Sequence, residues 1–356
     1  MCSYLKKNLI LGILILGTSL LFAQRPVNYD SPEYEYNLAV ELLQKEKYGS
    51  AQQYFKYVYE HTHDKQQDIK SNSYFYMGIC AAQLYNEDAI FLLKDFIRHY
   101  PVHSYVPEAY YHLGKFYFYK RQYKKVLDSF SQIDERNVRP TEMAEYRFKL
   151  GYSYFATGDS YEAKYHLNQA RLEEGEYQLR AIYYLAHIAY EEQNYEPALQ
   201  DFLLLKDEPE YQNVVPYYIV QIYFLQKRYE ELIAVAPPLF EKTTDKNKSD
   251  IARSLALAYY NLGMYKNAEE YFDFYLNDKN AQPDRKDNFA AGYTYYNTEN
   301  FSKSIKYLSE SAKDSVDIIT QTALYVIGDC YLKSQQLDLA TQSFYEASQL
   351  DFSSDM

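Results

Sequence analysis

Small and apolar residues recur along this chain with a period of 34 to 39 residues. Each unit carries one small residue, then an aromatic or apolar residue three positions later and, in most units, Ala twelve positions later. The small positions are Ala39, Gly78, Gly114, Gly151, Ala186, Ala256, Gly292 and Gly328, with Val220 at the equivalent place in the sixth unit. A unit of this length cannot bury its own apolar face and must stack on its neighbours. The pattern therefore predicts an array of nine stacked units.

The third unit shows how each unit is expected to fold. Its apolar residues follow helical spacing in two stripes, Tyr110, Leu113, Gly114 and Tyr117 in the first and Val126, Phe130 and Ile133 in the second. Because Gly114 has no side chain, the second helix can approach the first closely there. The turn at residues 120–122 is short enough to join only antiparallel helices. Each unit is therefore predicted to be an antiparallel helix pair.

These spacings resemble the tetratricopeptide repeat, whose signature is Leu-Gly followed by Tyr, Ala, Phe, Ala and a closing Pro. The fourth unit follows this signature with Gly151, Tyr154, Ala163, Leu167 and Ala170. The resemblance covers roughly residues 33–350. It implies an all-α, right-handed superhelical solenoid of about nine helix-turn-helix repeats, which binds a protein or peptide partner.

Two units depart from the pattern. The second reaches Ala89 only eleven residues after its small residue, which shortens the turn between its helices by one residue. The sixth has Val220 at its small position, and Pro237 and Pro238 follow in its second helix. A proline inside a helix removes a hydrogen bond and clashes with the preceding turn, at about 3 kcal/mol or more. We therefore expect a kink or break around residues 236–250.

The first 23 residues differ in character from the rest of the chain. Lys6 and Lys7 precede an apolar run from Leu9 to Ala23, which is the layout of a secretory signal peptide. A retained membrane anchor is the alternative, but the run is shorter than the roughly 20 residues that a spanning helix needs. No Cys follows the run, which argues against a lipoprotein anchor. The expected organisation is a signal peptide over 1–23, a linker over 24–32, the repeat array over 33–350 and a tail over 351–356.

Charge disfavours some classes of partner. The chain has 37 Lys and Arg against 49 Asp and Glu, a net charge of −12, and loss of Lys6 and Lys7 with the signal peptide makes it more negative. Such a surface disfavours nucleic acid and anionic lipid headgroups. Cys80 and Cys330 stand seven repeats apart, each two residues after a small glycine. We therefore expect two buried free thiols rather than a disulfide.

The first helices of the units are expected to line the inner side of the superhelix. Three residues before the small position, eight of the nine units have an aromatic residue, and Arg253 is the exception. Together with more variable positions on the same face, these residues form a candidate groove. The candidate groove residues are Tyr76, Tyr111, His112, Lys115, Phe148, Lys149, Tyr152, Tyr183, Tyr184, His187, Tyr217, Tyr218 and Phe224. This mixture is typical of binding hot spots, but the aromatic residues also suit packing against the next repeat, and both interpretations stay open.

Motifs for catalysis are missing from the sequence. It contains no glycine-rich phosphate loop, nucleophile elbow or metalloprotease helix. We therefore expect no enzyme activity, no cofactor and no metal. The expected function is a non-catalytic interaction scaffold that binds a peptide or a partner helix in its groove.

One segment points to a cellular setting. The sequence from His99 to Gly114 resembles the joint between repeats in periplasmic tetratricopeptide proteins of Gram-negative bacteria. With the signal peptide, this resemblance implies an exported protein of the cell envelope, periplasmic or associated with the outer membrane, with no transmembrane span after cleavage. The alternatives are a glycan-binding envelope protein that uses stacked aromatic residues, or the repeat portion of a longer protein. The sequence leaves the oligomeric state and the identity of the partner open.

Overall fold

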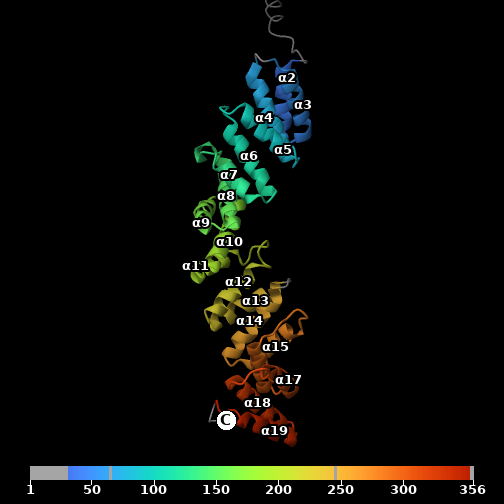
Figure 1. The fold of residues 1–356 in the computed structure, drawn as a ribbon, viewed down its shortest axis with the longest axis vertical. Helices are drawn as coiled ribbons and strands as arrows, with labels where there is room; N and C mark the ends of the chain where they lie inside the picture. The colour runs from blue at the N-terminus through green and yellow to red at the C-terminus, as the bar shows by residue number, and fades with distance from the viewer. Residues whose placement is uncertain (1–30, 64–65, 244–246, 353–356) are drawn as a thin grey trace, which may run out of the picture. The chain divides into compact units, whose positions relative to one another are not determined.

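The structure, a computed structural model, describes residues 31–63, 66–243 and 247–352. Throughout these ranges the regular structure is helical, with eighteen α-helices, short 3₁₀ helices and no strand (Figure 1). The helices follow one another as nine helix-turn-helix pairs, so the predicted α-solenoid of repeated helix pairs is confirmed. The right-handed twist of the array stays a prediction, and the predicted signal peptide lies outside the described residues.

The chain divides into two units between Ala181 and Ile182, inside α10 (Glu176–Glu191). The first unit contains four complete helix pairs. These are α2 (Pro32–Gln44) with α3 (Tyr48–His61), α4 (Gln67–Gln83) with α5 (Ala89–His99), α6 (Val106–Tyr119) with α7 (Tyr123–Phe130), and α8 (Met143–Thr157) with α9 (Ser160–Ala170). Two 3₁₀ helices, η2 (Glu135–Asn137) and η3 (Pro140–Glu142), connect α7 to α8.

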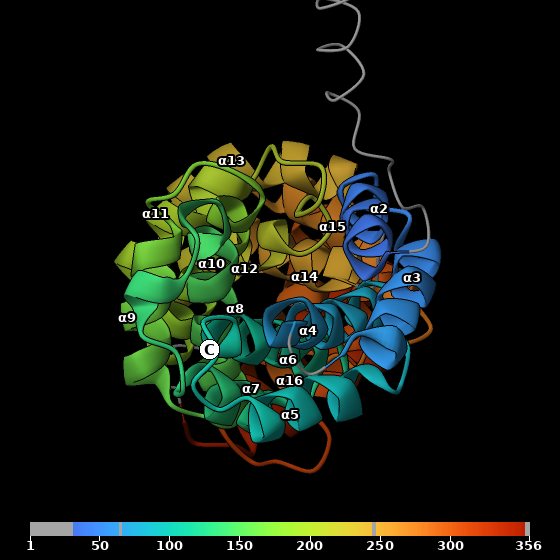
Figure 2. The same cartoon turned by 90° about the horizontal axis from the view of Figure 1, so that it is seen from above.

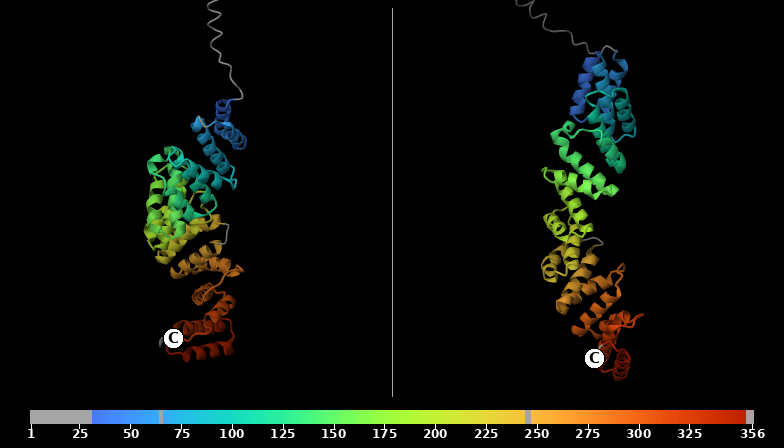
Figure 3. Two further views of the ribbon diagram at one scale, coloured as in Figure 1. Left: turned by 45° about the horizontal axis from the view of Figure 1, so that its top comes forward. Right: turned by 60° about the vertical axis from the view of Figure 1, so that its left-hand side comes forward.

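The second unit begins with the larger part of α10 and continues with nine further helices. These are α11 (Tyr195–Leu205), α12 (Val215–Leu225), α13 (Tyr229–Lys242), α14 (Asn247–Asn261), α15 (Tyr265–Asn277), α16 (Arg285–Asn297), α17 (Phe301–Ser311), α18 (Ile318–Lys333) and α19 (Leu337–Ser348). Figure 3 shows the last two, drawn in red, folded back beside each other.

Within each unit the first helices of successive pairs pack on one another. In the first unit α4 contacts both α2 and α6, and α6 contacts α8; in the second, α14 contacts α12 and α16. Figure 2 shows α4 and α8 on the inside of the curve of the first unit, with α3, α5, α7 and α9 outside them. In the same way α12 and α14 lie inside α11, α13 and α15 in the second unit. The first helices therefore form an inner face and the second helices an outer face.

The repeated small residue is the point of closest approach inside each pair. A methyl group added to Gly114 would lie 2.1 Å from a ring atom of Phe130, and one added to Gly292 would lie 2.6 Å from Leu308. The large residue stands sixteen positions after the small one in both pairs. Gly78 meets Leu93 in the same way, fifteen positions on. The small residue thus lets the two helices touch through one large side chain.

At the same two positions the sixth pair has the sizes exchanged. Val220 occupies the small position on α12, and the residue sixteen positions later on α13 is Ala236. Both are buried, with 0% and 1% of their surface exposed. The helix α13 continues through Pro237 and Pro238, so the expected break does not occur there. Residues 244–246, within the segment 236–250 where a kink or break is predicted, lie outside the described residues, and a kink stays a prediction.

A left-handed residue closes the turn of every described pair, seven positions after the small residue. These residues are Glu46, Tyr85, Arg121, Gly158, Gln193, Lys227, Gly263, Glu299 and Gln335. In the third pair Arg121 has a φ of 55°, and the next N–H, that of Gln122, donates to the carbonyl of Tyr117 at 2.9 Å. This arrangement ends a helix while satisfying its last carbonyl groups. The next helix begins two residues later, except in the second pair, where residues 84–88 connect α4 to α5 and α5 begins at Ala89. This connection is longer than that of any other described pair, so the predicted shortening of the turn is wrong.

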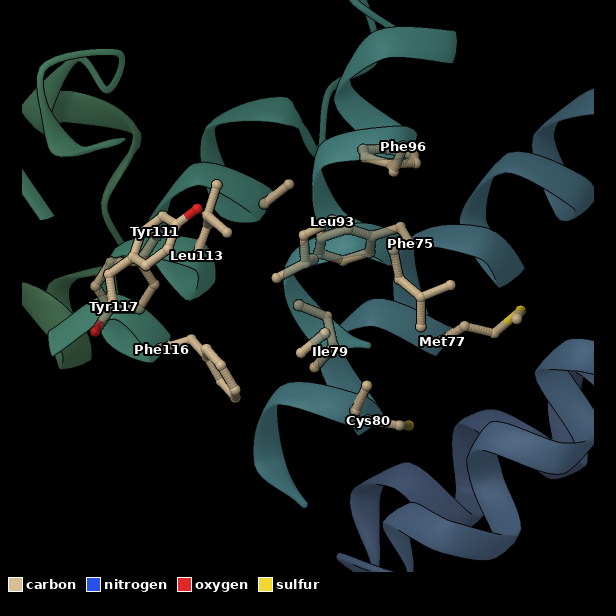
Figure 4. Packing of buried hydrophobic residues seen from close by; sticks show 14 of the residues in the cluster. Phe75, Met77, Ile79, Cys80, Leu93, Phe96, Tyr111, Leu113, Phe116 and Tyr117 are labelled. Atoms are coloured by element: carbon tan, nitrogen blue, oxygen red, sulfur yellow. The ribbon is translucent and has the colours of Figure 1, made fainter. Parts of the chain in front are cut away.

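Buried side chains of the first unit form a core that passes from pair to pair. Figure 4 shows Phe75 of α4 close to Leu93 and Phe96 of α5, and the ring centroids of Phe75 and Phe96 lie 5.4 Å apart. Leu113 and Tyr117 of α6 extend the same cluster. Burial of one pair therefore depends on its neighbours, as expected for a repeat that cannot fold alone.

The two cysteines of the described residues are buried and free, as predicted. Burial raises the pKa of the Cys80 thiol to about 12, so this thiol stays protonated at physiological pH. The Cys330 thiol donates to Ser304 Oγ at 3.4 Å. Both side chains act as small packing residues.

We expect Gly114→Ala to destabilise the protein, because its methyl group would meet Phe130, which is buried and cannot move without opening the core. The free energy of unfolding should fall by about 1–3 kcal/mol, the range for overpacking. Gly49 in α3 is a matched control, since nothing lies within 4 Å of an added methyl group there, and Ala at that helical site should gain up to about 1 kcal/mol. Urea unfolding followed by circular dichroism measures both variants, and equal effects would contradict the packing assignment.

Candidate functional site

Three of the predicted groove residues are buried. Tyr111, Phe148 and His112 expose 2%, 4% and 5% of their surface. Tyr111 stacks on Phe130 with ring centroids 6.1 Å apart, so this position serves packing between helices. Burial lowers the pKa of His112 to about 3, and its ring is therefore neutral at physiological pH. The prediction that these three side chains line an open groove is corrected, because they belong to the core.

In the first unit the carboxylate of Glu145 contacts three of the predicted groove residues, which lie on α6 and α8. Its Oε2 accepts hydrogen bonds from Tyr111 Oη at 3.0 Å and from Lys115 Nζ at 2.9 Å, and its Oε1 lies 3.2 Å from Lys149 Nζ. Burial opposes its ionisation, yet the two lysines hold the pKa of Glu145 below its ordinary value. Burial also lowers the pKa of Lys149, against the attraction of Glu145. We call Tyr111, Lys115, Glu145 and Lys149 the Glu145 cluster.

Aromatic rings surround the Glu145 cluster. Lys149 Nζ lies 4.4 Å from the ring centroid of Phe118, a distance at which the ring attracts a cation. The predicted residue Tyr152 lies beside the same ring, with centroids 5.4 Å apart. Tyr177, at the start of α10, packs on Phe148 at 5.3 Å. This part of the inner face therefore combines two half-buried cations with half-buried rings.

Tyr76 lies apart from the Glu145 cluster. Its hydroxyl donates to Tyr105 Oη at 3.2 Å, and its ring stacks on Phe55 with centroids 5.1 Å apart. Tyr76 is half-buried, so its contacts join α4 to its neighbours and leave only part of the ring on the inner face.

The predicted residues of α10 and α12 in the second unit form a series of ring contacts. The centroids lie 5.2 Å apart for Tyr183 and Tyr184, 5.5 Å for His187 and Tyr218, and 5.4 Å for Tyr217 and Tyr218. Tyr218 also stacks on the buried ring of Phe202 at 4.8 Å, so part of this residue serves packing. Phe224 is separate, since its ring contact is with Tyr229 at 6.1 Å. All five residues of the series are half-buried.

Tyr217 and Tyr218 line a cleft of about 800 Å³ in the second unit, which we call the α12–α14 cleft. Its other walls come from α14, from the end of α15 and from the connection to α16. These walls include Asn247, Ser249, Asp250, Arg253, Tyr275 and Asn280. Ring faces, amides and charged groups therefore meet in one concave site, and its volume lies in the range of ligand-binding clefts.

Arg253 stands three residues before the small position, where the other eight helix pairs have an aromatic residue. Its hydrogen-bond partners explain why an arginine occurs there. Its Nε donates to Asp287 Oδ2 at 2.8 Å, and its Nη2 donates to Asp284 Oδ2 at 3.3 Å. Tyr275 Oη donates to the same oxygen of Asp287 at 3.3 Å. Asp287 exposes only 1% of its surface, and a carboxylate buried to this degree needs a cation beside it. An ion pair thus replaces ring packing between α14 and α16.

Sequence reasoning missed several residues of these sites. Glu145 had a usable signal, because it stands four residues before Lys149 and such a pair lies on one face of a helix. Arg253 was visible as an exception, but nothing in the sequence named Asp287 as its partner. Tyr275 stands nineteen positions after Ala256, as Ile133 does after Gly114, so periodicity marks it as a packing residue and gives no sign of its place in the cleft.

The arrangement suits non-covalent recognition. Rings, lysines, an arginine and amides are presented at half-exposed positions, and they can stack, pair and donate hydrogen bonds. In the part of the chain that the structure describes, no group of three or more His, Cys, Asp and Glu is placed to hold a metal ion. No helix among those residues combines the length and the apolar character that crossing a membrane requires.

The fold defines an α-solenoid of repeated helix pairs, and the match to one family model agrees with this class. Residues 254–273 and 321–354 match the model of the tetratricopeptide repeat. A search of curated proteins found no match. Among solved structures the chain is similar to the apo form of RapI, with 16% identity, coverage of 89% of this chain and 97% of that chain, and a TM-score of 0.46. It is also similar to a signal-transduction ATPase with a tetratricopeptide repeat sensor from Pyrococcus horikoshii, with 14% identity, coverage of 92% and 54%, and a TM-score of 0.41.

We expect Arg253→Met to destabilise the second unit, because it leaves the Asp287 carboxylate buried without its cation. The free energy of unfolding should fall by about 3–5 kcal/mol, the range for breaking one side of a buried ion pair. The double variant Arg253→Met with Asp287→Asn should recover part of this loss. Arg228→Met is a control, since Arg228 pairs with exposed glutamates and little should change. Equal losses for both arginines in urea unfolding would contradict the role of Arg253.

Proposed function

We propose that this chain is a non-catalytic protein-interaction scaffold that binds an extended peptide or a partner helix on the inner faces of its first helices. The observation that carries the proposal is the α12–α14 cleft, where two tyrosines of α12 face polar groups of α14. Tyrosine rings supply contact area at low cost in conformational entropy. The amides and Arg253 supply hydrogen bonds for a peptide backbone or carboxylate.

The Glu145 cluster supports the same function in the first unit. Lys115 and Lys149 are held by one carboxylate at 2.9 and 3.2 Å, so both ammonium groups are positioned before any partner arrives. A partner then loses less conformational entropy on these side chains when it binds. Half-buried rings beside them offer apolar contacts, and this combination of Lys and aromatic groups is common where binding energy concentrates.

The proposal extends to the cell envelope. The apolar run after Lys6 and Lys7 has the layout of a signal peptide, and the net charge of −12 disfavours nucleic acid as a partner. The scaffold is therefore proposed to be exported and to hold a protein of the periplasm or of the outer membrane.

We expect Tyr217→Ala to weaken partner binding by about tenfold or more, because its ring lines the cleft and truncation of a central ring costs at least about 1.4 kcal/mol. The photo-crosslinking amino acid p-benzoylphenylalanine at position 217 identifies the partner in cells, and calorimetry with the purified partner measures the affinity. Tyr345→Ala on α19 is the matched control, since Tyr345 is 61% exposed and lies outside the cleft. Equal affinities for the two variants would refute the cleft as the binding site.

We expect the exported protein to begin at Gln24, because signal peptidase cuts after a small residue that follows the apolar run. Intact mass spectrometry of protein from periplasmic and membrane fractions checks this. Replacing Lys6 and Lys7 with Glu should leave the precursor uncut, since the positive end of the signal is lost. A chain that still begins at Met1 in every fraction would rule out export by this route.

A further inference from the structure

The outer face of the first unit carries a cleft of about 560 Å³ between α5 and α7, with α6 as its floor. Figure 2 shows α5 and α7 on the outer side of this unit, so the cleft opens away from the inner face discussed above. Lys94 and Arg98 contribute from α5, and Lys125 and Asp128 contribute from α7. Three cations and one carboxylate therefore line the opening.

Two of the cations converge on one ring. Lys94 Nζ lies 5.8 Å and Lys125 Nζ lies 5.4 Å from the ring centroid of Tyr117, which exposes only 3% of its surface. Among the described residues neither lysine pairs with a carboxylate, and Lys125 donates to Gln122 Oε1 at 2.9 Å. Two like charges held near one ring repel each other, and an anion bound between them relieves that repulsion. Arg98 differs, because Asp95 pairs with it.

The surrounding sequence adds to this positive field. The segment 94–125 contains Lys94, Arg98, Arg121, Lys124 and Lys125 against the acidic residues Asp95 and Glu108, apart from Lys115 and Lys120, which pair with Glu145 and Glu87. The whole chain has a net charge of −12. The cleft is thus a local exception on an acidic protein, and complementary charge favours an acidic partner and speeds its association.

The floor of the cleft is apolar. Leu113 and Tyr117 expose 2% and 3% of their surface, and the half-buried side chains of Ile97 and Tyr110 complete the walls. A free anion such as phosphate gains no stabilisation from an apolar floor. An aromatic or aliphatic side chain packs on that floor and is removed from water, which is favourable. A long polyanion would meet the negative charge of the rest of the chain.

From these observations we propose that this cationic cleft is a second binding site, which takes an acidic peptide segment of a partner protein. The segment places one apolar side chain on Leu113 and Tyr117, and carboxylates on either side of it pair with Lys94 and Lys125. The site opens between the second helices α5 and α7 over a floor on α6, and it shares no lining residue with the Glu145 cluster or the α12–α14 cleft.

Segments of this character also occur in the chain itself, and one with an exposed aromatic ring lies on α15. Phe274 is 43% exposed there and stands between Asp273 and Asp278. However, Asp273 is already engaged by Tyr295 Oη at 2.5 Å and by Lys303 Nζ at 2.6 Å. A separate peptide, whose carboxylates are free, therefore suits the cleft better than a second copy of this chain.

The test uses the fluorescein-labelled peptide Gly-Glu-Asp-Phe-Glu-Asp-Gly and fluorescence anisotropy with the full chain. We expect saturable binding that weakens as salt rises from 20 to 200 mM, as ionic contacts require. The double variant Lys94→Gln with Lys125→Gln should bind at least tenfold more weakly, with an unchanged urea unfolding curve. Lys266→Gln with Lys306→Gln is the matched control, since it removes two exposed lysines outside the cleft, one of them 4.5 Å from a tyrosine ring centroid.

Four results would overturn the proposal. The first is no binding of the acidic peptide at 1 mM protein, and the second is equal affinity for the two double variants. The third is equal binding of a peptide with Gln in place of every acid, or with Gly in place of Phe. The fourth comes from light scattering: self-association that only the Lys94 and Lys125 variant abolishes would make a second copy the occupant.

Discussion

The contact between a small residue on one helix and a large residue on the next is the constraint on which the rest of this structure depends. Gly114 and Phe130 show it most sharply, because an added methyl group would lie 2.1 Å from the ring. This contact fixes how closely the two helices approach. The left-handed residue of the turn, Arg121 in the same pair, then fixes where the second helix starts. The distance between the two helices and the start of the second helix are therefore set by two features of each helix pair.

The same register decides which side chains are left for binding. Tyr111, three positions before Gly114, is buried by packing between helices, whereas Lys115, one position after Gly114, stays half-exposed. In the first unit the half-exposed positions of the inner face hold two lysines around Glu145, and in the second half-exposed residues line the α12–α14 cleft. The two inner faces thus differ in chemistry although one backbone pattern builds both. An array of this kind can recognise different segments of a partner with different units.

The sequence predicted the fold well because the fold depends on local spacing. The helix pairs, the close approach at Gly114 and the buried thiol of Cys80 all follow from offsets within one or two units. The binding site was harder to predict, because the burial of a side chain depends on the neighbouring helix pair. Phe148 is buried, and periodicity alone cannot distinguish its position from a solvent-exposed one. The helix α13 continues through Pro237 although local propensity would end it there, because α13 packs on its neighbours, and the predicted kink around residues 236–250 stays a prediction.

The exchange of sizes between Val220 and Ala236 bears on how such an array can change over time. Recombination can add or remove repeats at a point inside a helix pair only if the first and second helices that it joins still fit together. A first helix with glycine at the small position fits any second helix that has Phe or Leu at the facing position. Such helix pairs can therefore exchange their first or second helices. Val220 opposite a large ring would overfill the contact, and glycine opposite Ala236 would leave a void. A half of the sixth pair therefore does not fit the other half of a pair built on glycine and a large ring.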